Sequence, residues 1–328
     1  MIKIAIIGCG AITERIHLPV LADSDEFTVY ALVDSNAERA RHLAAQYTIP
    51  LAVQNYQEIA DKVEAAVIAV PHHLHADIAT DLMNKGIDVL VEKPLALTDS
   101  DCDTMIEAAQ RNNKVLLAGY VRRYYPNLRF VKRLIDGNVI GNIRKIDMRE
   151  GGIFSWGIKS DFTFKKDLGG GVLSDIGSHV LDIFSWWFGE AEVVDYFDDA
   201  MGGVEANAEI HLKTPNGIES VVELSKTRLL RNSYIISGDE GTIEVGHKHT
   251  SPVYISLRDT DRRIIADMEN RSAEFPLQDI FVFQLREFYE AIVSEKKPYV
   301  DGYEGRMSVS LINRCYRVRQ KLCYPWEQ

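Results

Sequence analysis

Short apolar runs alternate with amphipathic, helix-length stretches over the first 120 residues of the chain. Five runs have the length and composition of buried strands: Ile2–Ile7, Thr28–Val33, Ala66–Val70, Val89–Val91 and Val115–Gly119. Between them lie stretches with helical periodicity: Asn36–Gln46, Leu74–Asn84 and Asp99–Arg111. Apolar strands separated by helices predict a parallel sheet that is covered on both faces. We therefore predict a dinucleotide-binding, Rossmann-like α/β domain over residues 1–120.

The pattern changes after residue 120, where strand-like segments dominate. A helical stretch, Pro126–Asp136, is followed by these segments: Ile143–Arg149, Ala206–Lys213, Ile218–Lys226, Ser233–Ser237, Thr242–Val245 and Val253–Leu257. Short turns join some of them, which favours antiparallel pairing. Two more helical stretches follow, at about Leu277–Ser294 and Gly302–Lys321. We predict an α+β domain over residues 121–328 with a mostly antiparallel open sheet.

The composition is that of an ordinary globular protein, with 46% hydrophobic and 26% charged residues. A formal net charge of -11 argues against a general nucleic-acid binder, because such proteins are basic. No apolar run reaches the roughly 20 residues that span a bilayer, and the N-terminus lacks the features of a signal peptide. Four cysteines without metal-ligand spacing favour reduced thiols. We expect a cytoplasmic protein that has neither nucleic acid nor membrane as a partner.

A glycine-containing turn, Gly8–Thr13, joins the first strand to the following helix. Gly8 and Gly10 let a pyrophosphate approach the backbone, and Ala11 and Ile12 begin a helix whose N–H groups favour phosphate. Thr13 occupies the place of the usual third glycine. The fingerprint is therefore incomplete, and a turn that binds no nucleotide is the alternative.

Asp34 ends the second strand, where a carboxylate accepts hydrogen bonds from the adenosine ribose hydroxyls. A carboxylate there repels a 2′-phosphate, which favours NAD over NADP, although Arg39 is near enough in sequence to reach over. The alternative role for Asp34 is to cap a helix. Pro71 and Glu92 lie at the ends of two further strands, and we expect both to contact the cofactor.

Three residues have the side chains needed to move a proton to or from an alcohol: Lys93, Asp175 and His179. Lys93 directly follows an apolar strand. If the glycine run Gly169–Gly171 opens a helix, Asp175 and His179 share one helical face because they stand four residues apart. The alternatives are a surface lysine in a turn, a helix-capping aspartate and a histidine that is satisfied in the core.

Three histidines after the strand Ala66–Val70 invite comparison with a zinc site: His72, His73 and His75. No thiolate or carboxylate completes an obvious ligand set, and His72 and His73 point in different directions in a helix or a strand. We therefore expect no metal, and we interpret the segment as a loop at the carboxyl edge of the parallel sheet, beside the nicotinamide.

Three segments together resemble the Gfo/Idh/MocA family of oxidoreductases, which includes glucose–fructose oxidoreductase and inositol dehydrogenase: Ile6–Ile12, Val89–Ala96 and Gly170–His179. The likeness extends over essentially the whole chain. It implies a nicotinamide dinucleotide cofactor and a sugar, cyclitol or related polyol as substrate. It also implies that Lys93, Asp175 and His179 surround the reacting carbon, and that the open sheet of the second domain forms homodimers or homotetramers.

This interpretation assigns a role to each of the three residues. His179 removes the proton of a secondary hydroxyl during oxidation, and Lys93 stabilises the negative charge that develops on its oxygen. Asp175 orients the histidine or the sugar and favours the imidazolium. Two alternatives stay open: a non-redox sugar enzyme of the glycosidase or lyase type that retains NAD, and a regulatory protein that binds dinucleotide without turnover.

Four residues beyond the domain junction are candidates for substrate binding: Tyr120, Arg122, Arg123 and Trp156. Trp156 either stacks on a sugar face or belongs to the core. Arg122 or Arg123 would bind a phosphate or carboxylate with two hydrogen bonds. Because residues 120–150 are locally basic, they form either a solvated helix face or a patch that attracts an anionic substrate.

Overall fold

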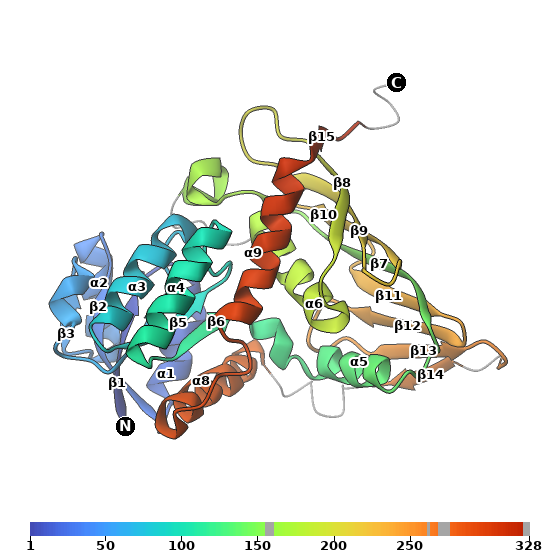
Figure 1. The fold of residues 1–328 in the computed structure, drawn as a ribbon. Coiled ribbons are helices and arrows are strands. Elements are labelled where there is room, and N and C mark those ends of the chain that lie inside the picture. The colour runs from blue at the N-terminus through green and yellow to red at the C-terminus, as the bar shows by residue number, and fades with distance from the viewer. Residues whose placement is uncertain (155–160, 261–262, 268–275, 324–328) are drawn as a thin grey trace.

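The computed structural model describes residues 1–154, 161–260, 263–267 and 276–323, which contain two sheets and their helices (Figure 1). Sheet A is entirely parallel, with the order β3-β2-β1-β4-β5-β6. Its strands are β1 (Ile2–Ile7), β2 (Phe27–Val33), β3 (Leu51–Val53), β4 (Ala65–Ile68), β5 (Asp88–Glu92) and β6 (Leu116–Gly119). This order reverses between β1 and β4, and ligands of doubly wound folds bind at such a switch point.

Helices connect the strands of sheet A, and two of the longer ones begin at a capping side chain. Asn36 caps α2 (Ala37–Tyr47) by accepting the Arg39 N–H, and Thr98 caps α4 (Asp99–Asn112) by accepting the Asp101 N–H. The remaining segments are a π-helical turn η1 (Thr13–His17), α1 (Leu18–Ala22), η2 (Tyr56–Ile59), η3 (His72–Leu74) and α3 (His75–Asn84). No helix in the described parts of the chain combines the length and apolarity that crossing a membrane requires.

Sheet B has nine strands in the order β14-β13-β12-β11-β7-β10-β9-β8-β15. Its pairs are antiparallel except β7 with β10 and β8 with β15. The strands are β7 (Ile143–Gly151), β8 (Glu192–Asp198), β9 (Asn207–Lys213), β10 (Glu219–Ser225), β11 (Ser233–Gly238), β12 (Gly241–Gly246), β13 (Val253–Leu257), β14 (Arg263–Ala266) and β15 (Arg319–Lys321). The predicted mixture of a parallel sheet and a mostly antiparallel sheet is therefore confirmed.

Helices cover the side of sheet B that faces sheet A (Figure 1). They are α5 (Pro126–Asp136) and α6 (Ser178–Phe188), and a π-helical turn, η7 (Leu173–Gly177), leads directly into α6. Short 3-10 turns precede these helices: η4 (Val121–Tyr124) before α5, then η5 (Asp161–Phe164) and η6 (Lys166–Leu168) before η7. Alternate residues of β10 are buried toward the helices, as a half-covered sheet requires.

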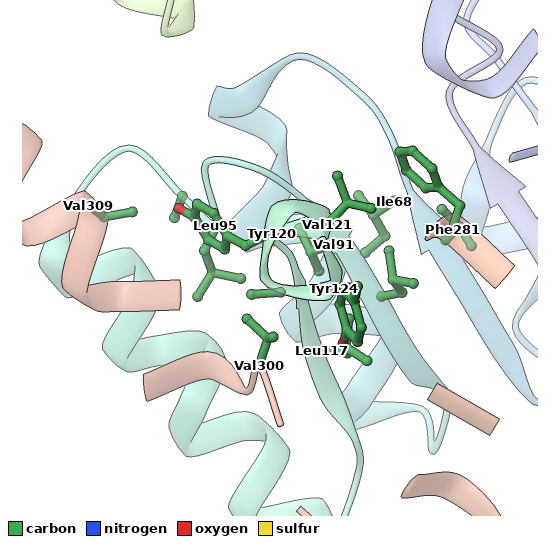
Figure 2. Packing of buried hydrophobic residues seen from close by; sticks show 14 of the residues in the cluster. Ile68, Val91, Leu95, Leu117, Tyr120, Val121, Tyr124, Phe281, Val300 and Val309 are labelled. Carbon is green, nitrogen blue, oxygen red and sulfur yellow. The ribbon is translucent and has the colours of Figure 1, made fainter. Parts of the chain in front are cut away.

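The last two helices return to the first half of the chain. The ring of Phe288 on α8 (Leu277–Ser294) stacks on Phe27 of β2, with centroids 5.9 Å apart. On α9 (Gly302–Arg317), Arg306 pairs with Asp103 of α4. Figure 2 shows the shared core, in which Tyr124 of η4 packs among side chains from both sheet A and the C-terminal helices. The two halves are thus joined by a continuous apolar cluster.

The sequence pattern missed the shortest and the edge strands. β3 has only three residues, and β8, β14 and β15 lie at or near an edge of sheet B, where alternation is weak. The last predicted helix was too long, because α9 ends at Arg317 and the chain continues into β15.

Candidate active site

The first glycine turn has space for a ligand. Gly8 has φ +98°, and a Cβ there would lie 2.2 Å from the Ala69 carbonyl oxygen, so only glycine fits. A Cβ on Gly10 would meet no atom within 4 Å. The buried Thr13 hydroxyl donates to the Gly8 carbonyl at 2.6 Å and so closes the turn from within. The missing third glycine is therefore replaced by a side chain that stabilises the turn.

Asp34 is tied to this turn. Its Oδ2 accepts the Cys9 N–H at 2.7 Å, and its Oδ1 accepts the Asn36 N–H at 2.7 Å. The alternative that Asp34 itself caps α2 is wrong, because Asn36 is the N-cap. Arg39 does reach over, with its Nη1 3.7 Å from Asp34 Oδ2. Each carboxylate oxygen keeps a lone pair for a further donor, as a ribose hydroxyl would supply.

Glu92 and Pro71 lie at the carboxyl edge of sheet A, near the same turn. Glu92 Oε1 lies 2.8 Å from Nε2 of His17 in η1, and Oε2 accepts the Lys93 N–H at 3.2 Å. Burial disfavours the charged Glu92, but its bond to His17 outweighs this and lowers the pKa of the carboxyl. Pro71 precedes η3 and accepts the Leu74 N–H. Glu92 therefore joins two segments of the first half of the chain, η1 and the residue after β5.

Lys93 and Asp175 bring the two halves of the chain together. Lys93 Nζ donates to Asp175 Oδ1 at 2.8 Å and to the Asp175 carbonyl at 3.3 Å. Lys93 directly follows β5, whereas Asp175 lies in η7, on the covered side of sheet B. The Lys93 side chain is 16% exposed and that of Asp175 39% exposed, so the ion pair is open to solvent on the Asp175 side.

A second lysine, Lys226, contacts the other oxygen of the same carboxylate. Its Nζ lies 2.9 Å from Asp175 Oδ2 and 4.9 Å from the ring centre of Phe154. The sequence pattern placed Lys226 at the end of a predicted strand, and β10 in fact ends one residue earlier, at Ser225. A charged residue at the end of a strand is the only signal in the sequence, and it does not identify Asp175 as the partner.

The local charges set the protonation of Asp175 and His179. Enclosure by protein disfavours the Asp175 carboxylate, but Lys93 and Lys226 outweigh this and hold its pKa well below the usual range. Burial, followed by the charges of Arg122 and Lys93, lowers the pKa of His179 well below its usual value. Asp175 does favour the imidazolium, as predicted, but the other effects outweigh it, so His179 is neutral at pH 7.

His179 is not oriented by Asp175 in this structure. Asp175 makes its contacts with the two lysines, while His179 Nδ1 is buried without a hydrogen-bond partner among the described residues. The His179 ring meets Tyr120 edge-on, with centroids 6.5 Å apart. Asp175 and His179 were predicted to share one helical face. The continuous helix of η7 and α6, whose first turn is π-helical, is compatible with this.

The glycine run positions this helix between the two halves. Gly171 has φ +114°, and a Cβ there would lie 2.2 Å from Glu205 Oε1. Glu205 is buried and accepts the Leu173 N–H at 2.9 Å, so it satisfies a free donor at the helix start. The carbonyl of Gly169 lies 2.8 Å from His72 Nδ1, which links the run to sheet A.

The predicted substrate residues have different environments. Arg123 was predicted to bind substrate. It is only 1% exposed, and its guanidinium bonds to Asp182 and Glu304 instead. Its burial is explained by these two carboxylates, which the sequence places 59 and 181 residues away.

Tyr120 is likewise fully buried, with its hydroxyl bonded to Ser308, so it is also not a substrate-facing residue. Arg122 makes two 2.7 Å hydrogen bonds to Glu150 and is only partly exposed. Trp156 lies outside the described residues.

Two of the three histidines in the His72–His75 segment, His72 and His75, bond to backbone carbonyls. His75 has Nδ1 2.9 Å from the Pro94 oxygen and Nε2 3.0 Å from the Val70 oxygen. Burial lowers the pKa of His72 to about 3, so its Nδ1–H donates to Gly169 as a neutral imidazole. The described residues contain no group of three or more His, Cys, Asp or Glu that is suited to a metal ion.

Comparisons with known proteins agree with this arrangement. Residues 2–120 match the family model described as "Oxidoreductase family, NAD-binding Rossmann fold", and residues 128–244 match the "GFO/IDH/MocA C-terminal domain". A scyllo-inositol 2-dehydrogenase (NADP+) of Bacillus subtilis is 29% identical over the full length of both chains.

Solved structures show the same fold over nearly the whole chain. A 3-ketoreductase from Actinomadura kijaniata, in complex with NADP and TDP-benzene, superposes with a TM-score of 0.86 at 22% identity and covers 99% of both chains. A levoglucosan dehydrogenase in complex with NADH and L-sorbose gives a TM-score of 0.85 at 20% identity, covering 97% of this chain and 96% of that one.

Proposed function

The chain belongs to the GFO/IDH/MocA oxidoreductase family, and we propose that it transfers a hydride between NAD(P) and a secondary hydroxyl or keto group of a sugar, cyclitol or sugar derivative. The observation that carries this proposal is the 2.8 Å contact between Lys93 and Asp175. Lys93 lies at the carboxyl edge of sheet A, where Rossmann folds bind a dinucleotide. The full-length relative that is named for inositol oxidation supports the same substrate class.

The turn after β1 fits a dinucleotide. The space above Gly10 accommodates a pyrophosphate, and the N–H groups of Ala11 and Ile12 at the helix start would bind its oxygens. Asp34 would accept the adenosine ribose hydroxyls, and Pro71 would lie beside the nicotinamide half. When bound, NAD(P) supplies the hydride acceptor for oxidation or the hydride donor for reduction.

The chain's own residues move and hold the proton. Lys93 turns one N–H toward the reacting oxygen and stabilises the negative charge that develops there. His179, which is neutral at pH 7, accepts the hydroxyl proton during oxidation and returns it during reduction. Asp175 holds Lys93 in place through its Oδ1. Arg122 lowers the proton affinity of His179 by its charge, and its bonds to Glu150 fix its position.

We also propose that NAD is preferred over NADP. Asp34 repels a 2′-phosphate, and Arg39 is already near the Asp34 carboxylate. Replacement of Asp34 by serine is expected to raise the ratio of kcat/KM for NADP to that for NAD at least about tenfold, because one repulsive charge is worth about 1.4 kcal/mol or more at this range. An unchanged ratio would contradict the role of Asp34.

The division of labour between the halves is part of the proposal. Residues 1–120 bind the dinucleotide, and residues 121–328 bind the substrate and assemble two or four copies through the uncovered face of sheet B. The protein works in the cytoplasm, which the free thiols Cys9, Cys102, Cys315 and Cys323 support. Light scattering that shows only monomers at micromolar concentration would refute the assembly.

A redox assay tests the function directly. The purified protein is mixed with NAD or NADP and with scyllo-inositol, levoglucosan or glucose, and reduced dinucleotide is followed at its absorbance maximum. We expect stoichiometric formation of a keto product and reduced dinucleotide with at least one polyol. Turnover of a glycoside without net dinucleotide reduction would identify the non-redox alternative, and dinucleotide binding without any turnover would identify a regulatory protein.

A further inference from the structure

Lys226 is a buried cation that the proposed proton transfer does not use. Its side chain is 10% exposed, and its Nζ makes no properly oriented hydrogen bond to any residue that the structure describes. Its neighbours are Asp175 Oδ2, at 2.9 Å, and the ring of Phe154. An ammonium without a counter-charge is costly to bury, so the pairing with Asp175 is the reason that this position tolerates a lysine.

Lys93 has one N–H left for the reacting oxygen while it holds Asp175. An ammonium has three N–H donors, and Lys93 directs two of them at Asp175, one to Oδ1 and one to the backbone carbonyl. Any shift of Lys93 toward a substrate weakens its contact with the carboxylate. Lys226 binds the other carboxylate oxygen, so Asp175 keeps a counter-charge throughout.

We infer that Lys226 is a positioning residue, which fixes the Asp175 carboxylate so that its Oδ1 can hold Lys93 at the reacting carbon. This inference rests on the proposed function. The Nζ of Lys226 has almost no exposed surface, so Lys226 acts through Asp175 and does not contact the substrate. The phenyl ring of Phe154 shields the ammonium from one side and limits its movement away from Asp175.

Four titratable groups from different segments of the chain lie near enough to Asp175 to interact with it electrostatically. Lys93 follows β5, Lys226 follows β10, His72 lies in η3 and His179 lies in α6. The two lysines lower the pKa of Asp175, whereas burial lowers the pKa of both histidines and keeps them neutral. Removal of Lys226 therefore leaves Lys93 as the only cation that contacts Asp175 among the residues that the structure describes, and the carboxyl becomes easier to protonate.

The first experiment measures kcat and KM for Lys226→Met, Lys226→Arg and a control, Lys213→Met, in which an exposed lysine at the end of β9 is replaced. In Lys226→Met we expect kcat to fall about 10- to 100-fold with little change in KM, because the reacting groups are misplaced. Lys226→Arg should restore most of kcat, and Lys213→Met should match the wild type.

Two kinetic outcomes overturn the inference. One is a Lys226→Met variant with the wild-type kcat. The other is a Lys226→Arg variant that is as impaired as Lys226→Met, because a charge-independent loss indicates packing alone.

A second experiment separates this inference from the proposed function, because it needs no turnover. Thermal unfolding is measured for Lys226→Met in the wild-type background and in Asp175→Asn. Pairing predicts that Lys226→Met lowers the Tm less, or raises it, when residue 175 is asparagine, because the unpaired lysines then repel each other. An equal change in Tm in both backgrounds contradicts the pairing, whether or not any polyol is oxidised.

Discussion

Two glycine-rich connections of this chain enter helices that both begin with a π-helical turn, but the space at their glycines differs. At Gly10 a Cβ would meet nothing within 4 Å, whereas at Gly171 it would meet Glu205 Oε1 at 2.2 Å. The first connection leaves its helix start open to a ligand, and the second fills it with a carboxylate from the chain. Glycines before a helix therefore do not by themselves identify a phosphate site, because the neighbours decide what the space holds.

The second connection organises protein groups. Glu205 bonds to the Leu173 N–H on one side of the run, and the Gly169 carbonyl bonds to His72 of the first half on the other. These contacts fix the helix that carries Asp175 and His179 relative to both sheets. In the proposed mechanism, the open turn therefore holds the dinucleotide, and the filled connection holds the groups that move the proton.

Of the substitutions that test this difference, replacement of Gly171 by alanine should have the largest effect on stability and activity. The added Cβ would collide with the Glu205 carboxylate, and the backbone has φ +114°. We expect a loss of about 3 kcal/mol in the free energy of unfolding, measured by denaturant titration, together with a large loss of kcat. Gly203→Ala is the control, because a Cβ there meets nothing within 4 Å. Equal stability of the two variants would show that the second connection is not filled.

Replacement of Gly10 by alanine should affect binding and spare stability. The site has room for a Cβ, so the Tm should stay at the wild-type value. The methyl group would keep a pyrophosphate from the backbone, and the loss of one hydrogen bond to a charged group predicts a Kd for NADH that is about tenfold higher or more. Fluorescence titration with NADH measures it. A wild-type Kd would mean that the open turn does not hold the dinucleotide.

The smallest expected effect concerns His72, which bonds to the Gly169 carbonyl of the second connection. Burial lowers the pKa of His72 to about 3, below its ordinary value of 6.5. The unfolded chain therefore binds the extra proton first, and this group costs stability as the pH falls below about 6.5, by at most about 1.4 kcal/mol per pH unit. His72→Asn removes the titration, so its free energy of unfolding should fall less steeply between pH 6.5 and 4.5. Parallel curves for the variant and the wild type would contradict the neutral, buried His72.

Much of this arrangement could be predicted from the pattern of residues. The apolar runs located five of the six strands of sheet A, and the order of strands placed Lys93 at their carboxyl edge. Local sequence does not show which distant side chains meet. Lys226 was missed because its partner, Asp175, belongs to another element, and Arg123 was misassigned because its carboxylate partners come from α6 and α9.

We propose that Lys93, from residues 1–120, acts on the substrate, while Asp175, from residues 121–328, holds Lys93 in place. The most direct measurement compares Lys93→Met with the wild type for kcat and for the Kd of NADH. We predict that kcat falls at least about 100-fold, the usual scale of acid–base catalysis, while the Kd stays unchanged. A variant that turns over at nearly the wild-type rate would contradict the account.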